Sequence, residues 1–356
     1  MDLSDLVSHV IGVDTHKHSH TAAVVDATTG GAVANAQATV FANRGGYETL
    51  FDLADEHSTA GERAWAIECT GSYGAGLTEF LIQRGEWVIE VDRPITQARR
   101  DGAKSDELDA VRAAREVLGR DQWSSPRARG EREAMRVLVT TREGAVRDRT
   151  RAINQLKAMI VSAPDTLRDR LRDVSGRELI DRCAGLRDST TRTVDRQATV
   201  AALRRLARRI RHLDREIAEH DHDLRDLTNE HCPQLVIEYG VGHVTAAQAY
   251  MSWSHPGRCR NEAAFASLAG TAPIDASSGQ VIRRRLNRGG DRKLNRALHT
   301  VIVTRSRGHQ PTQTYIARRV AEGKSEREAR RCLKRYLARH LYRLLENQPQ
   351  HALDNT

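Results

Sequence analysis

The sequence predicts a mixed α/β domain at the N-terminus and a mostly helical remainder. Short apolar runs rich in Val, Ala and Ile alternate with helical patterns over residues 1–128. Apolar residues then recur at helical spacing over residues 129–230, and a turn-rich stretch leads into a basic helix over residues 231–356. A chain of 356 residues is long enough for these three parts to be separate domains.

Three expected strands in hairpin order open the first domain. The run VIGVD predicts the first strand, HTAAVVD predicts the second, and the Gly30-Gly31 turn leads into a third, AVANAQATV. A helix is expected to follow over Asn43–Glu56, because Asn43 is a favourable N-cap residue.

The rest of this domain alternates between strand and helix. AWAIE predicts a buried strand, and GAGLTEFLIQRG predicts a helix that Gly85 ends. EWVIEVD predicts a further strand, and SDELDAVRAAREVL predicts a helix capped by Ser105. Three strands followed by helix, strand, helix, strand and helix is the order of an RNase H-like (RuvC-like) domain, although fold class alone does not give function.

Four acids lie where they could converge. Asp14 and Glu68 close the first and fourth expected strands, while Asp106 and Asp109 are three residues apart and share one face of a helix. Singly, each is as well explained as a solvated acid or a helix cap. Together they predict a site for two hard divalent cations that serve phosphoryl transfer. Asp92, at another strand end, is an alternative ligand on spacing alone.

Histidines and cysteines give weaker signals. His16, His18 and His20 alternate in HKHSH, which is slight evidence for a metal site. The five cysteines are scattered and form no CxxC pair, so a zinc site is not expected, and free thiols suit a reducing cytoplasm. Because neither a signal peptide nor an apolar run of membrane-spanning length is apparent, we expect a cytoplasmic protein that does not associate with a membrane.

The middle part predicts two long helices separated near Pro164. The second carries a heptad-spaced seam of about four heptads, formed by Leu203, Leu206, Ile210, Leu213, Ile217, His220, Leu224 and Leu227. This pattern predicts a long helical hairpin or a coiled coil that assembles protomers, with His220 as a polar position that sets the pairing. The alternative is an ordinary amphipathic helix packed within one protomer.

Positive charge is concentrated near the C-terminus. The segment from Arg283 to Arg343 holds 19 Lys or Arg against 4 Asp or Glu, a net charge of +15, which leaves −6 of the total +9 for the rest of the chain. With aromatics at only 4%, contacts to phosphates are favoured over base stacking. The expected phosphate contacts are Arg283, Arg284, Arg285, Arg288, Arg292 and Lys293.

Two short motifs in the C-terminal part also suggest nucleic-acid chemistry. Gly240-Val241-Gly242, placed before an expected helix, is similar to the turn of a helix-hairpin-helix element, whose amides hold a phosphate, although a plain tight turn explains it equally well. Ser277-Ser278-Gly279 lies beside the RRR run, where guanidinium groups would hold a phosphate for an attacking hydroxyl. The alternative is an ordinary Ser/Gly turn.

The motifs GVDTHK, IECTGSYG, KSDELDA, GVG, AGTAPIDASSG and NRGGDRKLNRAL follow one another in this order. In order and spacing, over nearly the whole chain, they resemble the DEDD transposases of the insertion-sequence family "one-ten". These enzymes are also called bridge recombinases and include the Piv-type DNA invertases; the actinobacterial-type members are the most similar. Two departures are Tyr239, where many members have Pro, and Gly290-Asp291, which replaces a common Gly-Asn.

The resemblance implies a composite active site. Its nucleophile would be Ser278, with Ser277 as the neighbouring alternative. Its Mg²⁺ ligands would be Asp14, Glu68, Asp106 and Asp109. The implied partners are double-stranded donor and target DNA, a non-coding bridge RNA that sets sequence choice, and further copies of the chain in a dimer or tetramer, so that one chain's acids meet another's serine. The serine would form a phosphoserine link that a 3′-hydroxyl resolves. The resemblance also implies a bacterial protein that associates with the nucleoid.

Two other functions remain open from the residues themselves. A structure-specific nuclease, such as a Holliday-junction resolvase, would use the same acids with a metal-activated water and would not need Ser278. A non-catalytic nucleic-acid-binding protein would need neither, but the complete set of four acids argues against it.

Overall fold

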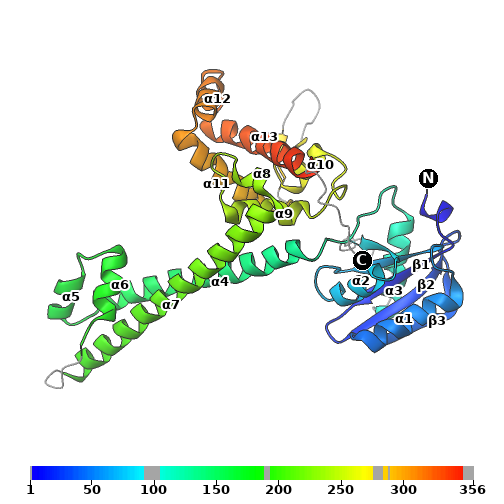
Figure 1. The fold of residues 1–356 in the computed structure, drawn as a ribbon, viewed down its shortest axis with the longest axis horizontal. Coiled ribbons are helices and arrows are strands. Elements are labelled where there is room, and N and C mark those ends of the chain that lie inside the picture. The colour runs from blue at the N-terminus through cyan, green and yellow to red at the C-terminus, as the bar shows by residue number, and fades with distance from the viewer. Residues whose placement is uncertain (1, 92–104, 188–192, 276–283, 288, 348–356) are drawn as a thin grey trace. The chain divides into compact units, whose positions relative to one another are not determined.

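The chain divides into two units, Met1–Ala128 and Arg129–Thr356 (Figure 1). The computed structural model describes residues 2–91, 105–187, 193–275, 284–287 and 289–347. A mixed α/β unit followed by a mostly helical one confirms the fold class expected from the sequence. The finer division of the second unit at residue 230 stays a prediction.

A five-stranded sheet forms the centre of the N-terminal unit (Figure 1). The strands are β1 (His9–Thr15), β2 (Ser19–Asp26), β3 (Ala32–Phe41), β4 (Arg63–Glu68) and β5 (Trp87–Val91). Their order is β3-β2-β1-β4-β5, with β2 antiparallel to both of its neighbours, β1 and β3, and with β4 and β5 parallel to β1. All five expected strands are therefore confirmed. The central strand β1 is almost continuously apolar because both of its faces are covered.

Helices cover both faces of this sheet. A short 3₁₀ helix, η1 (Leu3–Asp5), precedes β1. On one face α1 (Arg44–His57) and α2 (Ala75–Ile82) pack against Ile11 and Ile67, whereas α3 (Asp106–Leu118) packs against Val10 and Ala66 on the other. This division follows from the period of two along a strand. Both expected caps are confirmed, since Asn43 accepts from the Gly46 amide (3.0 Å) and Ser105 accepts from the Leu108 amide (3.2 Å).

Gly12 lets α3 lie directly on β1. A Cβ atom at this position would be 1.9 Å from the carbonyl oxygen of Ala110, so no larger residue fits without moving the helix. The helix backbone therefore rests on the strand backbone. This contact brings the N-terminal turn of α3 toward the end of β1, where Asp14 lies.

A buried ion-pair network joins β4 to the start of β5. The Arg63 side chain is fully buried and donates two hydrogen bonds to Glu86, of 2.9 and 2.7 Å. The Trp65 indole also donates to Glu86 (2.7 Å), and the half-exposed Asp55 lies 2.6 Å from Arg63. Because both charges are paired, this buried polar group is compatible with folding.

The second unit begins with a long helical hairpin made of α4 (Glu131–Val161) and α7 (Val194–His231), which lie side by side in Figure 1. Two ion pairs cross between the helices, Arg142–Asp221 (2.6 Å) and Arg149–Asp214. Helix α4 ends just before Pro164, as expected. Two short helices, α5 (Asp165–Leu171) and α6 (Gly176–Ala184), pack against the hairpin and share a core with it.

At least half of the heptad seam of α7 packs against other parts of the same chain. Leu203, Ile210, Leu213 and Leu224 are buried, while Leu206, Ile217, His220 and Leu227 are partly exposed. The expected hairpin is thus confirmed. A coiled coil between protomers stays a prediction. Among the described residues, no helix combines the length and apolar character needed to cross a membrane.

Short and long helices complete the second unit. They are α8 (Pro233–Val236), α9 (His243–Trp253), α10 (Glu262–Leu268), α11 (Arg292–Gly308), α12 (Gln310–Ala321) and α13 (Glu326–Glu346), with a two-stranded ribbon of β6 (Pro273–Asp275) and β7 (Arg284–Leu286). Helix α9 is buried at the centre of their core. The expected basic helix is confirmed as α13. It begins with a capping box at Ser325.

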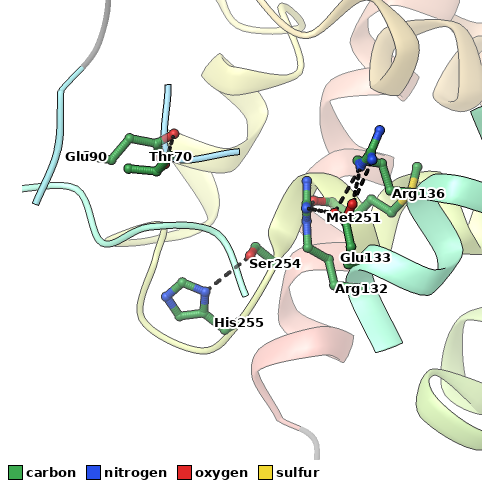
Figure 2. Close-up of polar contacts among 8 residues, drawn as sticks. All are labelled: Thr70, Glu90, Arg132, Glu133, Arg136, Met251, Ser254 and His255. Carbon is green, nitrogen blue, oxygen red and sulfur yellow. Dashed lines mark hydrogen bonds and ion pairs between the residues drawn. The ribbon is translucent and has the colours of Figure 1, made fainter. Parts of the chain in front are cut away.

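The start of α4 is fixed to this core. Arg132 is buried and donates a hydrogen bond of 3.3 Å to the carbonyl oxygen of Met251 in α9 (Figure 2). Glu133 beside it pairs with Arg136 at 2.6 Å, and the pKa of the Glu133 carboxyl is lowered by that hydrogen bond. The hairpin and the C-terminal helices therefore share one anchored junction.

Candidate metal centre and nucleic-acid surface

The parallel pairing of β1 with β4 brings Asp14 and Glu68 to one edge of the sheet. Val13 is in register with Ile67, and the next residue on each strand is an acid. The Thr15 hydroxyl donates to the Glu68 carbonyl oxygen (3.0 Å) and ties the two strand ends together. Since Val13 and Ile67 pack beneath α1 and α2, strand alternation directs both acids toward the face that carries α3.

Helix α3 contributes the other two acids from its first turn. Asp106 is the first residue of the helix and Asp109 follows in the same turn, a position where the helix dipole favours negative charge. The close contact at Gly12 places this turn near the end of β1. Ligand atoms of Asp14, His16 and Asp106 all lie within 4.8 Å of one another. Asp14 and Asp106 therefore meet, as the sequence predicted.

His16 joins this group by way of the β1–β2 turn. Its backbone amide donates to the carbonyl oxygen of Ser19 (2.9 Å), and its Nδ1 lies 3.7 Å from Oδ2 of Asp14. The side chain of Asp14 is only 14% exposed, whereas that of His16 is 48% exposed. Sequence reasoning gave His16 little weight. Its position two residues beyond Asp14, at the start of a tight turn, was the signal that could have found it.

The other two histidines of HKHSH lie elsewhere. His18 is exposed in the turn. His20 is buried on the opposite face, where its ring stacks on Tyr47 with centroids 5.7 Å apart and its Nδ1 lies 2.9 Å from the carbonyl oxygen of Ser19. Burial lowers the pKa of His20, so it behaves as a neutral core residue. The alternation therefore does not mark a three-histidine site.

Asp109 and Glu68 stand apart from the close group. Asp109 accepts a hydrogen bond of 2.8 Å from Arg112 on the same helix, and both side chains are about a quarter exposed. In the ranges that the structure describes, neither Asp109 nor Glu68 belongs to the group within 4.8 Å. Asp92, the alternative ligand, lies outside the described residues. The roles of Asp109 and Glu68 as ligands stay predictions.

The loop after Glu68 holds the end of β4 in a fixed shape. Cys69 has a φ of 54°, a left-handed conformation that is uncommon for residues other than glycine. Its carbonyl oxygen accepts from the amides of Ser72 (2.8 Å) and Gly74 (3.2 Å). Thr70 donates to Glu90 of β5 at 2.9 Å, as Figure 2 shows. These contacts fix the backbone immediately after the acid.

The donor set fits a divalent cation. Two carboxylates and an imidazole converge from β1, the turn that follows it and the N-terminus of α3. Carboxylate oxygens are the ligands of Mg²⁺ and Ca²⁺, and a mixed oxygen and nitrogen set also suits transition metals. Such an ion would offset the repulsion between Asp14 and Asp106 and could bind a phosphate oxygen.

Family models match both units of the chain. The model of the IS110 DEDD transposase matches residues 11–163, and the model described as transposase IS116/IS110/IS902 family matches residues 238–317. This chain belongs to the IS110 family of transposases. The first match includes all four acids, and the second includes the Gly240 turn and both serines. A search of the curated proteins gives no match.

An IS110-family transposase cleaves and rejoins DNA, so the position of the nucleophile matters. Ser277, Ser278 and Arg283 lie in residues 276–283, which are outside the described residues. Arg288 is also outside the described residues. The segments that flank them pair as the antiparallel ribbon of β6 and β7, from Pro273 with Leu286 inward. The nucleophile therefore stays a prediction.

The Gly240 turn of the transposase is a supported loop at the start of α9. Gly240 has a φ of 80°, which favours glycine, and Gly242 is the N-cap of α9. Arg305 of α11 donates to the carbonyl oxygen of Tyr239 (2.7 Å) and also pairs with Glu238. Phosphate binding by this turn stays a prediction.

Both departures from the family pattern have packing roles. Tyr239 stacks on His309, with ring centroids 5.1 Å apart. Asp291 caps α11, because its carboxylate accepts from the amides of Lys293 (2.9 Å) and Leu294 (3.0 Å), and it also accepts from Ser252 (2.8 Å). Neither change alters the four acids or the two serines.

Many cations of the basic C-terminal segment are neutralised by acids outside it. Lys293 and Arg296 pair with Glu143 of α4, and Arg339 pairs with Glu262 of α10. Of the expected phosphate contacts, Lys293 is therefore engaged in an ion pair, while the exposed Arg285 and Arg292 remain candidates. The net charge of +15 thus overstates the charge that this segment offers to DNA.

A stripe of arginines on α13 is a stronger candidate for contact with DNA phosphates than the basic segment as a whole. Arg327, Arg331 and Arg335 are four residues apart, so they share one helix face. None of the three forms an ion pair with another residue in the described part of the chain. A count of charges along the sequence could not separate these arginines from the others, because it does not show which arginines form ion pairs.

We expect this stripe to set part of the salt dependence of DNA binding. Replacing Arg327, Arg331 and Arg335 with alanine should lower the slope of log Kd against log salt by about 2 to 3, since each phosphate contact contributes about 0.9. The measurement is fluorescence anisotropy with a labelled duplex at several salt concentrations. Arg330→Ala is the control, because Arg330 already pairs with Glu326 and should change the slope much less. An unchanged slope in the triple variant would exclude the stripe.

Proposed function

We propose that this chain is a site-specific DNA recombinase of an insertion sequence, which cuts and rejoins DNA through the hydroxyl of Ser278. Mg²⁺ ions held by the acid set would assist, and a bridge RNA would guide the choice of DNA. The observation that carries the proposal is the meeting of Asp14 and Asp106 at one sheet edge in a chain of the transposase family.

An RNase H-like architecture for the first unit is part of the proposal. It is supported by the strand order β3-β2-β1-β4-β5, with three antiparallel strands first and two parallel strands after them. It is also supported by the placement of the acids near the end of β1, at the end of β4 and at the start of α3.

In the proposed reaction, the Ser278 oxygen attacks a DNA phosphorus and the bond from phosphorus to the 3′-oxygen breaks. The hydroxyl proton is lost to solvent and the departing 3′-oxygen gains one, leaving a phosphoserine link. The 3′-hydroxyl of the partner strand then attacks the same phosphorus and restores the serine. Bound Mg²⁺ would stabilise the charge that develops on the phosphate oxygens. Asp14, Asp106, Glu68 and Asp109 would hold the cation and orient the phosphate.

Assembly and RNA guidance complete the proposal. A composite site would join the acids of one chain to the serine of another, and the partly exposed seam residues Leu206 and Ile217 are candidates for contact between protomers. Guidance by a bridge RNA rests on the resemblance of the motifs to bridge recombinases.

The deciding experiment removes the nucleophile. A labelled DNA substrate would be incubated with Mg²⁺, the element's RNA and protein, and the products separated on a denaturing gel. Ser278→Ala should lose both cleavage and the covalent protein–DNA adduct, while Ser277→Ala should be much milder. Cleavage by the double variant, with no adduct from the wild type, would instead support the nuclease that uses water. An adduct that persists only in Ser278→Ala would assign the reaction to Ser277.

A further inference from the structure

We propose that His16 is a nitrogen ligand of the metal centre and shifts its preference toward a first-row transition metal such as Mn²⁺. The inference rests on the proposed metal centre and concerns its selectivity. It arises from the one close group of ligand atoms found among the described residues, which contains His16 together with Asp14 and Asp106.

The distances suit a shared ion. Metal bonds to nitrogen and oxygen of about 2.1 Å allow two ligands of one ion to be up to about 4.2 Å apart. The ligand atoms of this group lie within 4.8 Å of one another. Side-chain rotations that move these atoms by less than about 1 Å would bring them to the separation that one shared ion allows. Asp14 and Asp106 are placed by β1 and α3, and His16 is placed by the turn that follows β1.

The ring of His16 is available for this role. Its Nδ1 is 3.7 Å from Asp14 Oδ2, which is longer than a hydrogen bond, and the ring has no hydrogen-bond partner in the described part of the chain. The side chain is half-exposed and next to the largely buried Asp14, so an ion could reach both from solvent. His20, by contrast, is committed to its stack with Tyr47.

Ligand chemistry gives the expected selectivity. Mg²⁺ favours a shell of oxygen ligands and loses its waters reluctantly, whereas first-row transition metals also accept imidazole nitrogen. A set of two carboxylates alone would suit Mg²⁺ and Mn²⁺ alike. Adding one imidazole strengthens binding of Mn²⁺ more than binding of Mg²⁺, and it leaves the carboxylates free to serve either ion.

Electron paramagnetic resonance of Mn²⁺ bound to the full chain tests the assignment without measuring DNA cleavage. The wild type should show modulation from a directly bound ¹⁴N nucleus, and His16→Asn should lose it. Asparagine still offers an oxygen, so the variant should weaken Mn²⁺ binding by about tenfold or more while Mg²⁺ binding, measured by competition, changes by less than about threefold. His18→Asn, in the same exposed turn, should leave the modulation and both affinities unchanged.

Asp14→Asn separates this inference from the metal centre itself. Loss of both ions in Asp14→Asn, together with loss of the nitrogen signal in His16→Asn, supports the two proposals. If Asp14→Asn abolishes binding but His16→Asn keeps the nitrogen signal or the Mn²⁺ affinity, only the role of His16 is overturned. If Asp14→Asn binds both ions like the wild type, the proposed metal centre fails as well. Circular dichroism spectra of each variant confirm that the fold is retained.

Discussion

Replacing Asp14 with asparagine is expected to lower DNA cleavage by about 10²–10³-fold or more, because it removes a charged ligand from the centre of the group. The same result is expected for Asp106→Asn. The substitution keeps the shape of the side chain, so the sheet and the contact at Gly12 should remain and DNA binding should be largely retained. The measurement is single-turnover cleavage of a labelled duplex at saturating protein, with the far-ultraviolet circular dichroism spectrum as the check on folding.

Asp52→Asn is the matched control for this prediction. Asp52 is an exposed acid on α1, which covers the opposite face of the sheet, so its loss changes the net charge equally without touching the metal centre. Its cleavage rate should stay within about twofold of the wild type, since surface substitutions of this kind have small effects. Full activity in both Asp14→Asn and Asp106→Asn would remove the metal hypothesis.

Asp109→Asn and Glu68→Gln test the rest of the acid set. If a second cation binds here, Asp109 must exchange its hydrogen bond with Arg112 for the cation. Both variants are then expected to lose cleavage as severely as Asp14→Asn. A mild effect in these two variants, beside a severe one in Asp106→Asn, would restrict the centre to a single ion.

The largest expected effect on stability comes from Glu86. Glu86→Ala should lower the free energy of unfolding of the N-terminal unit by about 3–5 kcal/mol, because it removes the buried carboxylate partner of the Arg63 guanidinium and leaves only the half-exposed Asp55. The indole of Trp65 loses its acceptor as well. Urea unfolding followed by tryptophan fluorescence measures this loss. A Trp253→Phe background confines the signal to Trp65, Trp87 and Trp123 of this unit.

Two further variants make the test of Glu86 specific. Asp55→Ala removes the half-exposed partner of Arg63 and should cost only about 1 kcal/mol or less. The double variant Arg63→Met/Glu86→Leu removes both buried charges and should be much closer to the wild type than Glu86→Ala is. A loss below about 1 kcal/mol in Glu86→Ala would show that water or another group replaces the carboxylate.

Much of the N-terminal unit was predictable because its signals are local. Strands that are buried on both faces appear as continuous apolar runs, and a cap such as Asn43 or Ser105 acts on amides three residues away. The four acids could also be selected, since their positions at strand ends and in one helical turn follow from periods of two and 3.6 residues. The motifs added the family, which the models confirm.

The amino-acid sequence alone was therefore enough to predict the strands and helices of the N-terminal unit, the mixed α/β class, the four candidate acids and the family. Which side chains meet became clear only from the folded chain. His16 joins Asp14 and Asp106, and Asp109 accepts from Arg112. Within the described residues, the stripe of Arg327, Arg331 and Arg335 on α13 forms no ion pair, while other arginines such as Arg339 are paired. Strand formation and helix capping could be predicted because they depend on neighbours along the chain. Metal ligation and ion pairing depend instead on distances of a few ångströms between segments far apart in sequence, and these are fixed by packing such as the backbone contact at Gly12.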